Sequence, residues 1–207
     1  MNLFQAANGA ATFLVLSALV AGLAKHFESV SGSPVQYLLD HLEIVYLGLF
    51  IVLFRIKTLF DDHKHFAEPP QDKNVFRYVG FVLAIISWIF WGLAAYLLPA
   101  TIRASELMAA SILISTLWVV VHVIEILVDK DRRNKEVLTS LMREKWVLVN
   151  VGYMLCLVAH VGWFRPVVKL GGAVALLILL GLLLFDIFTS RSFRDLIKPT
   201  QATGMSS

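Results

Sequence analysis

Long apolar runs alternate with short charged segments along the chain. A helix rises about 1.5 Å per residue and the hydrocarbon core of a bilayer is about 30 Å thick, so a membrane-spanning helix needs about 20 mostly apolar residues. The segments that reach or approach this length are residues 3–24, 35–54, 78–98, 107–128, 146–164 and 170–188. The pattern predicts an all-α, polytopic membrane protein with six transmembrane helices arranged as three antiparallel hairpins.

The second of these segments is unusual, because only residues 44–54 are uncharged between Glu43 and Arg55. This run is too short to cross the hydrocarbon core by itself, so we expect the span to extend back to Val35. Polar groups inside a span are costly unless they lie at the interface, face other helices or meet water. The polar residues that this choice brings into the first half of the span are Asp40, His41 and Glu43.

Composition supports the membrane interpretation. Apolar residues make up 58% of the chain and charged residues 16%, whereas soluble domains have about 45–50% and about 25%. A signal peptide is the alternative for the first run, but no Lys or Arg precedes it, so we expect it to be retained as the first helix. Residues 1–190 are expected to form one six-helix transmembrane domain and residues 191–207 a short cytoplasmic tail. The single cysteine, Cys156, excludes an intramolecular disulfide and a cysteine-based metal cluster.

The basic residues indicate the orientation of the chain. Most of the 18 Lys and Arg residues follow the second, fourth and sixth segments, and the exceptions are Lys25, Arg103, Arg165 and Lys169. By the positive-inside rule, both termini are expected in the cytoplasm, and the location is expected to be a plasma membrane such as a bacterial inner membrane. The basic residues form no continuous patch interleaved with aromatic residues, so no nucleic-acid partner is expected.

Two inner connections are longer than the others. Residues 61–73, with Pro69 and Pro70, are expected to form a loop, and residues 134–145 an interfacial helix or an extension of the fourth helix. The loop contains a weak metal site, because adjacent side chains in a loop point apart and Lys64 lies among the candidate ligands. These candidates are Asp61, Asp62, His63 and His65.

The inner ends of the second, fourth and sixth segments can be aligned with one another. The alignment places Lys57, Glu125 and Asp186 at equivalent positions. Three repeated hairpins about an axis along the membrane normal, as in some transporters, would give this pattern. The alternative is that apolar helices ending in charged loops resemble one another by composition alone.

A polar cluster is expected in the inner leaflet, because ionisable residues within a membrane are costly and often functional. Counted from the inner edge, the residues at similar depth are His122, Glu125, Asp186, Asn150 and Tyr153. Desolvation favours the uncharged form of a carboxylate, so the two acids are candidates for proton carriers or cation ligands. An equally weighted alternative is that Glu125 and Asp186 reach the interface or pair with basic residues, namely Arg132, Arg191 and Arg194.

A second polar cluster is expected at the outer side, formed by Asp40, His41, Glu43 and His160. By depth, His41 and His160 are the best pair for a haem with two imidazole ligands. Together with His26, they are also weak candidates for metal ligands. Histidines near an interface are commonly amphipathic filler, so no cofactor is predicted, and haem or a metal ion remains an alternative.

Three functions are therefore compared. The first is a channel or transporter for protons or small cations that uses the inner carboxylates. The second is a non-catalytic membrane subunit or assembly factor of a larger complex, and the third is a membrane electron carrier that binds haem or a metal. The expected partners are the lipid bilayer and either further copies of the chain or other membrane subunits. The chain contains no phosphate-binding loop, nucleophile elbow or HExxH motif, so nucleotide-driven transport and hydrolytic chemistry are not expected and a non-enzymatic function is favoured.

Overall fold

The computed structural model describes residues 3–30, 32–65, 75–128, 145–163 and 169–190. These residues form helices and contain no β-strand. The helices are α1 (Leu3–Ser29), α2 (Pro34–Asp40), α3 (Leu42–His65), α4 (Val75–Tyr96), α5 (Thr101–Val128), α7 (Trp146–Val158), the π-helical turn η1 (Ala159–Trp163) and α8 (Lys169–Thr189). The all-helical fold class is confirmed for this part of the chain.

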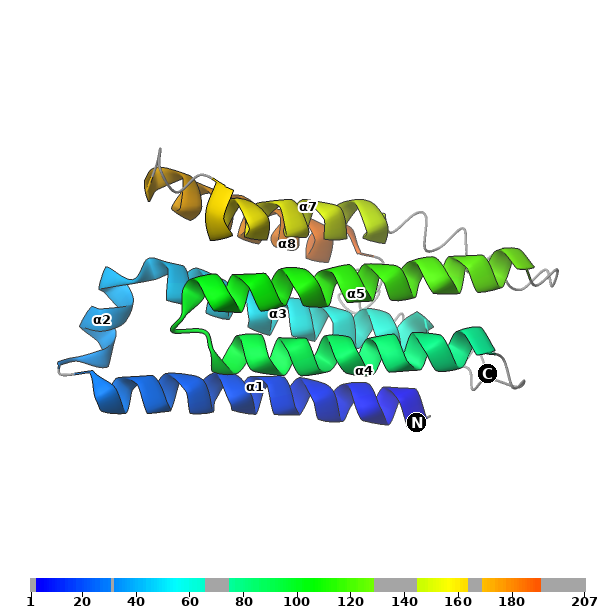
Figure 1. Cartoon of the computed structure of the whole chain (residues 1–207), viewed down its shortest axis with the longest axis horizontal. Coiled ribbons are helices and arrows are strands. Elements are labelled where there is room, and N and C mark those ends of the chain that lie inside the picture. Colours follow the sequence, from blue (N-terminus) through cyan, green and yellow to red (C-terminus); the bar gives the residue numbers. More distant parts are fainter. Residues whose placement is uncertain (1–2, 31, 66–74, 129–144, 164–168, 191–207) are drawn as a thin grey trace, which may run out of the picture.

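Six of the helices pack in a ring. In order around the ring, α1 contacts α4, α4 contacts α5, α5 contacts α7, α7 contacts α8, α8 contacts α3, and α3 contacts α1 again. Figure 1 shows that the long helices run side by side, with α2 across one end of the bundle. The ring brings α3 and α8, which are far apart in the sequence, into direct contact.

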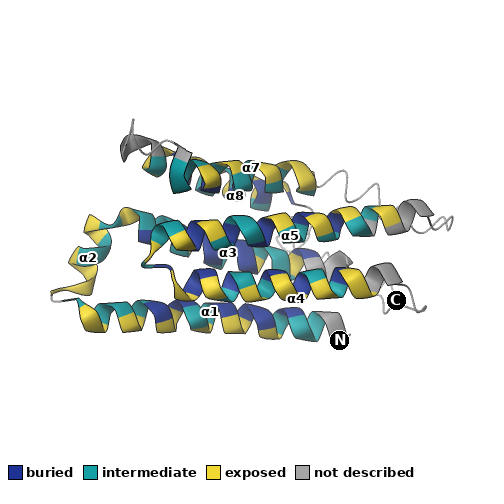
Figure 2. Cartoon of the chain, in the orientation of Figure 1, coloured by how far each residue is buried: buried dark blue, intermediate teal, exposed yellow. Residues whose placement is uncertain are grey.

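The outer surface of the ring is apolar. Exposed side chains include Phe13 and Leu14 on α1, Leu148 on α7, and Phe185 and Phe188 on α8, each 63–71% exposed. Figure 2 shows that exposed and buried residues alternate along the helices, as expected for helices with one face toward their neighbours. A soluble monomer rarely exposes so much continuous apolar surface, whereas lipid tails would cover it without penalty.

Four helices are long and apolar enough to cross a membrane: Gln5–Ser29, Tyr78–Tyr96, Thr101–Val121 and Gly172–Thr189. A fifth would be the pair Pro34–Asp40 and Leu42–Asp61, which is bent by 95°. The apolar helix Trp146–Gly162 is shorter than a full span. These lengths and compositions are those of a multi-pass membrane protein.

The second segment differs from its expected boundaries. Instead of one helix over residues 35–54, the chain turns sharply at His41, and α3 continues past Phe54 to His65. The turn is stabilised by the His41 ring, which stacks on Tyr37 and donates from Nδ1 to the Tyr37 carbonyl oxygen at 2.9 Å. The same carbonyl oxygen also accepts from the backbone N–H of His41 at 3.0 Å, so these contacts fix the position of His41 at the end of α2. The apolar run is therefore lengthened at its C-terminal side, through residues that carry charge.

Two further boundaries differ from expectation. Residues 61–65 belong to α3 and not to a loop, and α5 begins at Thr101 instead of residue 107. The earlier start of α5 buries Ala104 and Ser105 fully, while Arg103 and Glu106 pair at 3.3 Å on the exposed face. The expected interfacial helix over 134–145 and the tail over 191–207 lie outside the described residues, apart from Lys145, which precedes α7.

The contact between α1 and α4 depends on Gly22. A Cβ atom at this position would lie within 3 Å of backbone atoms of Tyr96 in α4, and backbone cannot move aside as the end of a side chain can. The helices therefore approach closely because Gly22 has no side chain, as at the small-residue contacts common between membrane helices.

Substitution Gly22→Ala is expected to lower the free energy of unfolding by about 1–3 kcal/mol, the usual cost of overpacking. Gly9→Ala is the matched control on α1, because its Cβ would meet no described atom within 4 Å. The measurement is a thermal or denaturant unfolding curve of each purified variant in detergent. Equal stability of the two variants would contradict the close α1–α4 contact.

Candidate functional site

A buried ammonium group joins α3 to α8. Lys57 Nζ lies 2.5 Å from Asp61 Oδ2 and 3.0 Å from Asp186 Oδ2. The Lys57 side chain is 9% exposed and the two carboxylates are 5% exposed. Asp61 lies one turn after Lys57 on α3, whereas Asp186 comes from α8, one turn before the end of that helix. The lysine therefore bridges a local carboxylate and a distant one.

Two hydroxyl groups complete this arrangement. The Tyr153 hydroxyl of α7 donates to Asp186 Oδ2 at 2.9 Å, and the Ser190 hydroxyl donates to Asp61 Oδ1 at 3.1 Å. The ring of Trp146 lies below the ammonium, with 5.9 Å from Lys57 Nζ to the ring centroid. We call Lys57, Asp61, Asp186, Tyr153 and Ser190 the Lys57 network. It connects α3, α7 and the end of α8.

Charge in the Lys57 network is not balanced. When all groups are ionised, two carboxylates face one ammonium, and the two hydroxyl groups are neutral. A net negative charge in a low-dielectric environment attracts a cation or a proton. Arg55 lines the adjoining cavity and supplies a second cation there, so the Lys57 network is suited to exchange its ammonium for another cation.

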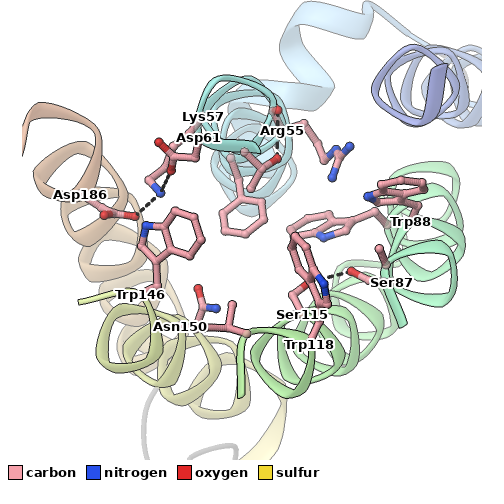
Figure 3. A pocket seen from close by; sticks show the side chains of 15 residues that line it. Arg55, Lys57, Asp61, Ser87, Trp88, Ser115, Trp118, Trp146, Asn150 and Asp186 are labelled. Carbon is pink, nitrogen blue, oxygen red and sulfur yellow. Dashed lines mark hydrogen bonds and ion pairs between the residues drawn. The ribbon is translucent and has the colours of Figure 1, made fainter. Parts of the chain in front are cut away.

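A partly open cavity of about 60 Å³ adjoins the Lys57 network. A water molecule needs about 10–15 Å³ of such space, so the cavity admits a few waters or a similarly compact ion. Figure 3 shows side chains from α3, α4, α5, α7 and α8 around it. We call this space the inner cavity. Its walls are formed by Phe54, Arg55, Lys57, Thr58, Asp61, Ala84, Ser87, Trp88, Trp91, Ser115, Trp118, Val119, Trp146, Asn150 and Asp186.

A second buried cation, Arg55, connects α3 to α1. Its Nη2 donates to Asn8 Oδ1 at 2.9 Å and to Thr12 Oγ1 at 2.8 Å, and the whole residue is 2% exposed. Thr12 in turn donates to the carbonyl oxygen of Asn8 at 2.9 Å. In Figure 3 the Arg55 side chain extends away from Lys57 and Asp61. The two basic residues of α3 thus hold different neighbouring helices.

Hydroxyl groups continue from the inner cavity between α4 and α5. Ser87 Oγ lies 2.7 Å from Ser115 Oγ and 2.8 Å from Ser111 Oγ, and Ser111 donates to the Ser87 carbonyl oxygen at 2.8 Å. On the next interface, Asn150 Nδ2 donates to Thr116 Oγ1 at 3.2 Å. These contacts give the cavity a polar wall within helices whose outer faces are apolar.

Three of the five residues expected in the inner cluster lie together. Tyr153 and Asp186 are hydrogen-bonded, and both Asp186 and Asn150 line the inner cavity or its immediate surroundings. His122 and Glu125 belong to the backbone of α5, but their side chains lie outside the described residues. Their participation stays a prediction. Among the described residues, the cation that pairs with Asp186 is Lys57, which the sequence pattern did not predict.

The outer residues have structural contacts. Gln36 Nε2 donates to Asp40 Oδ1 at 3.0 Å, and the His41 ring is engaged with Tyr37 at the bend. Glu43 lies in the first turn of α3, where the helix dipole favours a negative charge. The His26 ring lies 5.0 Å from the ring of Tyr37, between centroids.

The remaining outer histidine, His160, lies in the π-helical turn η1, which contacts α5, α7 and α8. Its ring is packed against α8 where Gly172 leaves space, since a Cβ there would lie 3.3 Å from His160 Nδ1. Within the described part of the chain, no group of three or more His, Cys, Asp or Glu residues is arranged to hold a metal ion. Haem ligation by His41 and His160 is not tested by these contacts and stays a prediction.

Lys57 and Asp61 were missed for an identifiable reason. Both follow the uncharged residues 44–54, so the pattern favours a place in the positive-inside count for Lys57 and a place in the inner loop for Asp61. Two signals were present in the sequence. The apolar run is too short to span a membrane, and Lys57 and Asp61 have the i,i+4 spacing of an ion pair on one helix face.

Comparison with protein-family models, with curated proteins and with solved structures found no match to this chain.

Substitution Lys57→Met is expected to lower the free energy of unfolding by about 3–5 kcal/mol, because it leaves two buried carboxylates without their cation. Arg103→Met is the control, because it removes the cation of an exposed ion pair, where the expected cost is about 0–1 kcal/mol. Both are measured by unfolding in detergent at neutral pH. Similar costs for the two variants would contradict a buried and energetically coupled Lys57.

Proposed function

We propose that this chain is an integral membrane channel or transporter for protons or small cations. The observation that supports the proposal is the pair of buried carboxylates that shares one ammonium beside the inner cavity. Ionisable residues inside membrane proteins often mark ion pathways and proton relays. Asp186 is the proposed site of proton or cation binding, Asp61 and Tyr153 are its partners, and Lys57 is the cation that occupies it in this structure.

The proposed topology has six spans, with α1, α3, α4, α5, α7 with η1, and α8 each crossing the bilayer. Both termini and the Lys57 network are then on the cytoplasmic side, in agreement with the distribution of Lys and Arg. The bend at His41 and the connection between α4 and α5 are on the outer side. The protein is proposed to reside in a plasma membrane such as a bacterial inner membrane.

The proposed pathway begins at the cytoplasmic end and enters the inner cavity. From there the hydroxyl groups of Ser87, Ser115 and Ser111 provide hydrogen-bonding groups toward the middle of the bundle. Nearer the outer ends of these helices, Ala94 of α4 and Met108 of α5 are fully buried and apolar, which would close the path in the present conformation. A conformational change at this position would complete transport, as in alternating-access mechanisms.

Flux is the direct test. We expect purified wild type in liposomes to carry protons or monovalent cations down an imposed gradient. Asp186→Asn and Glu125→Gln are each expected to lower the flux at least tenfold, because neither neutral side chain can bind the transported charge. Glu106→Gln is the control, because Glu106 is a carboxylate at the exposed end of α5, 44% exposed at its side chain.

Each variant is first checked by size-exclusion chromatography for a folded, monodisperse protein. Wild-type flux lost in Asp186→Asn and retained in Glu106→Gln supports the proposal. Absence of flux from folded wild type would contradict it and would favour the alternative of a non-catalytic subunit that requires partner chains.

A further inference from the structure

The walls of the inner cavity are unusually rich in indole rings. The chain contains five tryptophans, and those lining the cavity are Trp88, Trp91, Trp118 and Trp146. Phe54 adds a further ring, stacked on Trp91 with 4.8 Å between centroids. In Figure 3 the ring of Trp146 lies beside Lys57 and Asp186, whereas Trp88 and Trp118 lie across the space, on the side of Ser87. Indole faces carry negative electrostatic potential and attract organic cations.

The site already holds an ammonium ion, because Lys57 Nζ is an alkylammonium group attached to the chain. It is bound by two carboxylate oxygens and lies over the ring of Trp146. Carboxylates combined with an aromatic face are the groups that a free amine in its protonated form would require. The groups that contact Lys57 Nζ are therefore suited to bind a primary ammonium ion.

The lining of the inner cavity is less suited to a metal ion than to an ammonium ion. Hard cations such as Ca²⁺ and Mg²⁺ take six or more oxygen ligands, whereas much of this cavity is bounded by aromatic carbon. Among the described residues, no cluster of three or more metal-binding side chains is present. An ammonium ion needs fewer oxygen ligands, because its N–H groups bind the carboxylates while its carbon atoms contact the rings.

The ring of Trp118, which lines the inner cavity, packs against Gly80 of α4. A Cβ atom on Gly80 of α4 would lie 2.8 Å from ring atoms of Trp118 in α5. The ring of Trp118 thus lies directly against the backbone of α4. Gly80→Ala is expected to displace this ring, whereas Gly92→Ala on the same helix would bring no Cβ within 4 Å of a described atom.

We propose that the inner cavity binds a compact primary alkylammonium ion, which takes the place of the Lys57 ammonium between Asp61 and Asp186. Lys57 is then a tethered competitor, whose flexible stem lets its charged end withdraw toward the cytoplasmic interface when the ligand enters. The cavity of about 60 Å³ limits the ligand to a few non-hydrogen atoms. The inference rests on the proposed function and names the substrate class of the same site.

Binding is measured by calorimetric titration of the purified protein in detergent with methylammonium chloride, and with sodium chloride at matched ionic strength. Wild type is expected to bind methylammonium at least tenfold more tightly than sodium. Lys57→Ala is expected to bind methylammonium at least tenfold more tightly than wild type, because a tethered competitor has a high effective concentration. Asp186→Asn in the Lys57→Ala background is expected to reverse this gain.

The wall variants test the aromatic contribution. Gly80→Ala is expected to weaken methylammonium binding at least fivefold, and Gly92→Ala to leave it unchanged. If Lys57→Ala does not fold, Lys57→Gln replaces it. If neither variant folds, the ratio of methylammonium to sodium affinity in wild type tests the inference.

Equal affinity for the two cations in wild type, or unchanged methylammonium affinity on removal of Lys57, would overturn the inference. Flux assays separate it from the proposed function. Proton or sodium flux without methylammonium binding would reject the ammonium site and leave the transporter proposal intact. Methylammonium binding without flux of any cation would reject transport and leave the site intact.

Discussion

A charged group buried in an apolar environment is stable only where opposite charge and hydrogen bonds replace its lost water. Lys57 meets this requirement by contacts with Asp61 on its own helix and with Asp186 on α8. The inner half of α3 is too polar to be buried alone, so its position depends on groups from other helices. Asn8 and Thr12 of α1 meet the same need at Arg55. An ion pair to α8 and hydrogen bonds to α1 thereby help to determine which helices lie next to α3.

The same requirement connects packing to the proposed function. The helices form a ring with an apolar exterior, and their polar side chains gather at the inner cavity. Lys57 lies between two carboxylates, so the position that stabilises the α3–α8 contact is also a position where a cation binds. Displacement of the Lys57 ammonium would weaken this contact unless another cation replaced it. Binding and helix movement are therefore expected to be coupled at α8, as the proposed transport would require.

Much of the fold could be predicted from the apolar runs, since length and uncharged composition identified α1, α4, α5, α7 and α8 to within a few residues at most ends. The second span could not be located in this way. A hydropathy argument counts every charge as a cost, so it placed the span before Arg55. The cost is removed by partners more than 40 residues away in the chain, such as Asn8 for Arg55 and Asp186 for Lys57. The depth of each residue in the membrane, counted along its helix, predicted Asp186, Tyr153 and Asn150 as neighbours. The pairing of Lys57 with Asp186 could not be predicted in this way, because it requires the packing of α3 against α8.

The central claim is that a lysine ammonium occupies a cation site between two carboxylates inside the membrane domain. Solid-state NMR of the protein in lipid bilayers tests it directly, with ¹⁵N at the lysine Nζ positions and ¹³C at the aspartate carboxyl groups, and with Lys57→Arg to assign the signal. We expect a direct dipolar contact between Lys57 Nζ and both carboxyl carbons, which is lost when methylammonium is added. Absence of this contact in the ligand-free protein would show that Lys57 does not occupy a cation site between Asp61 and Asp186.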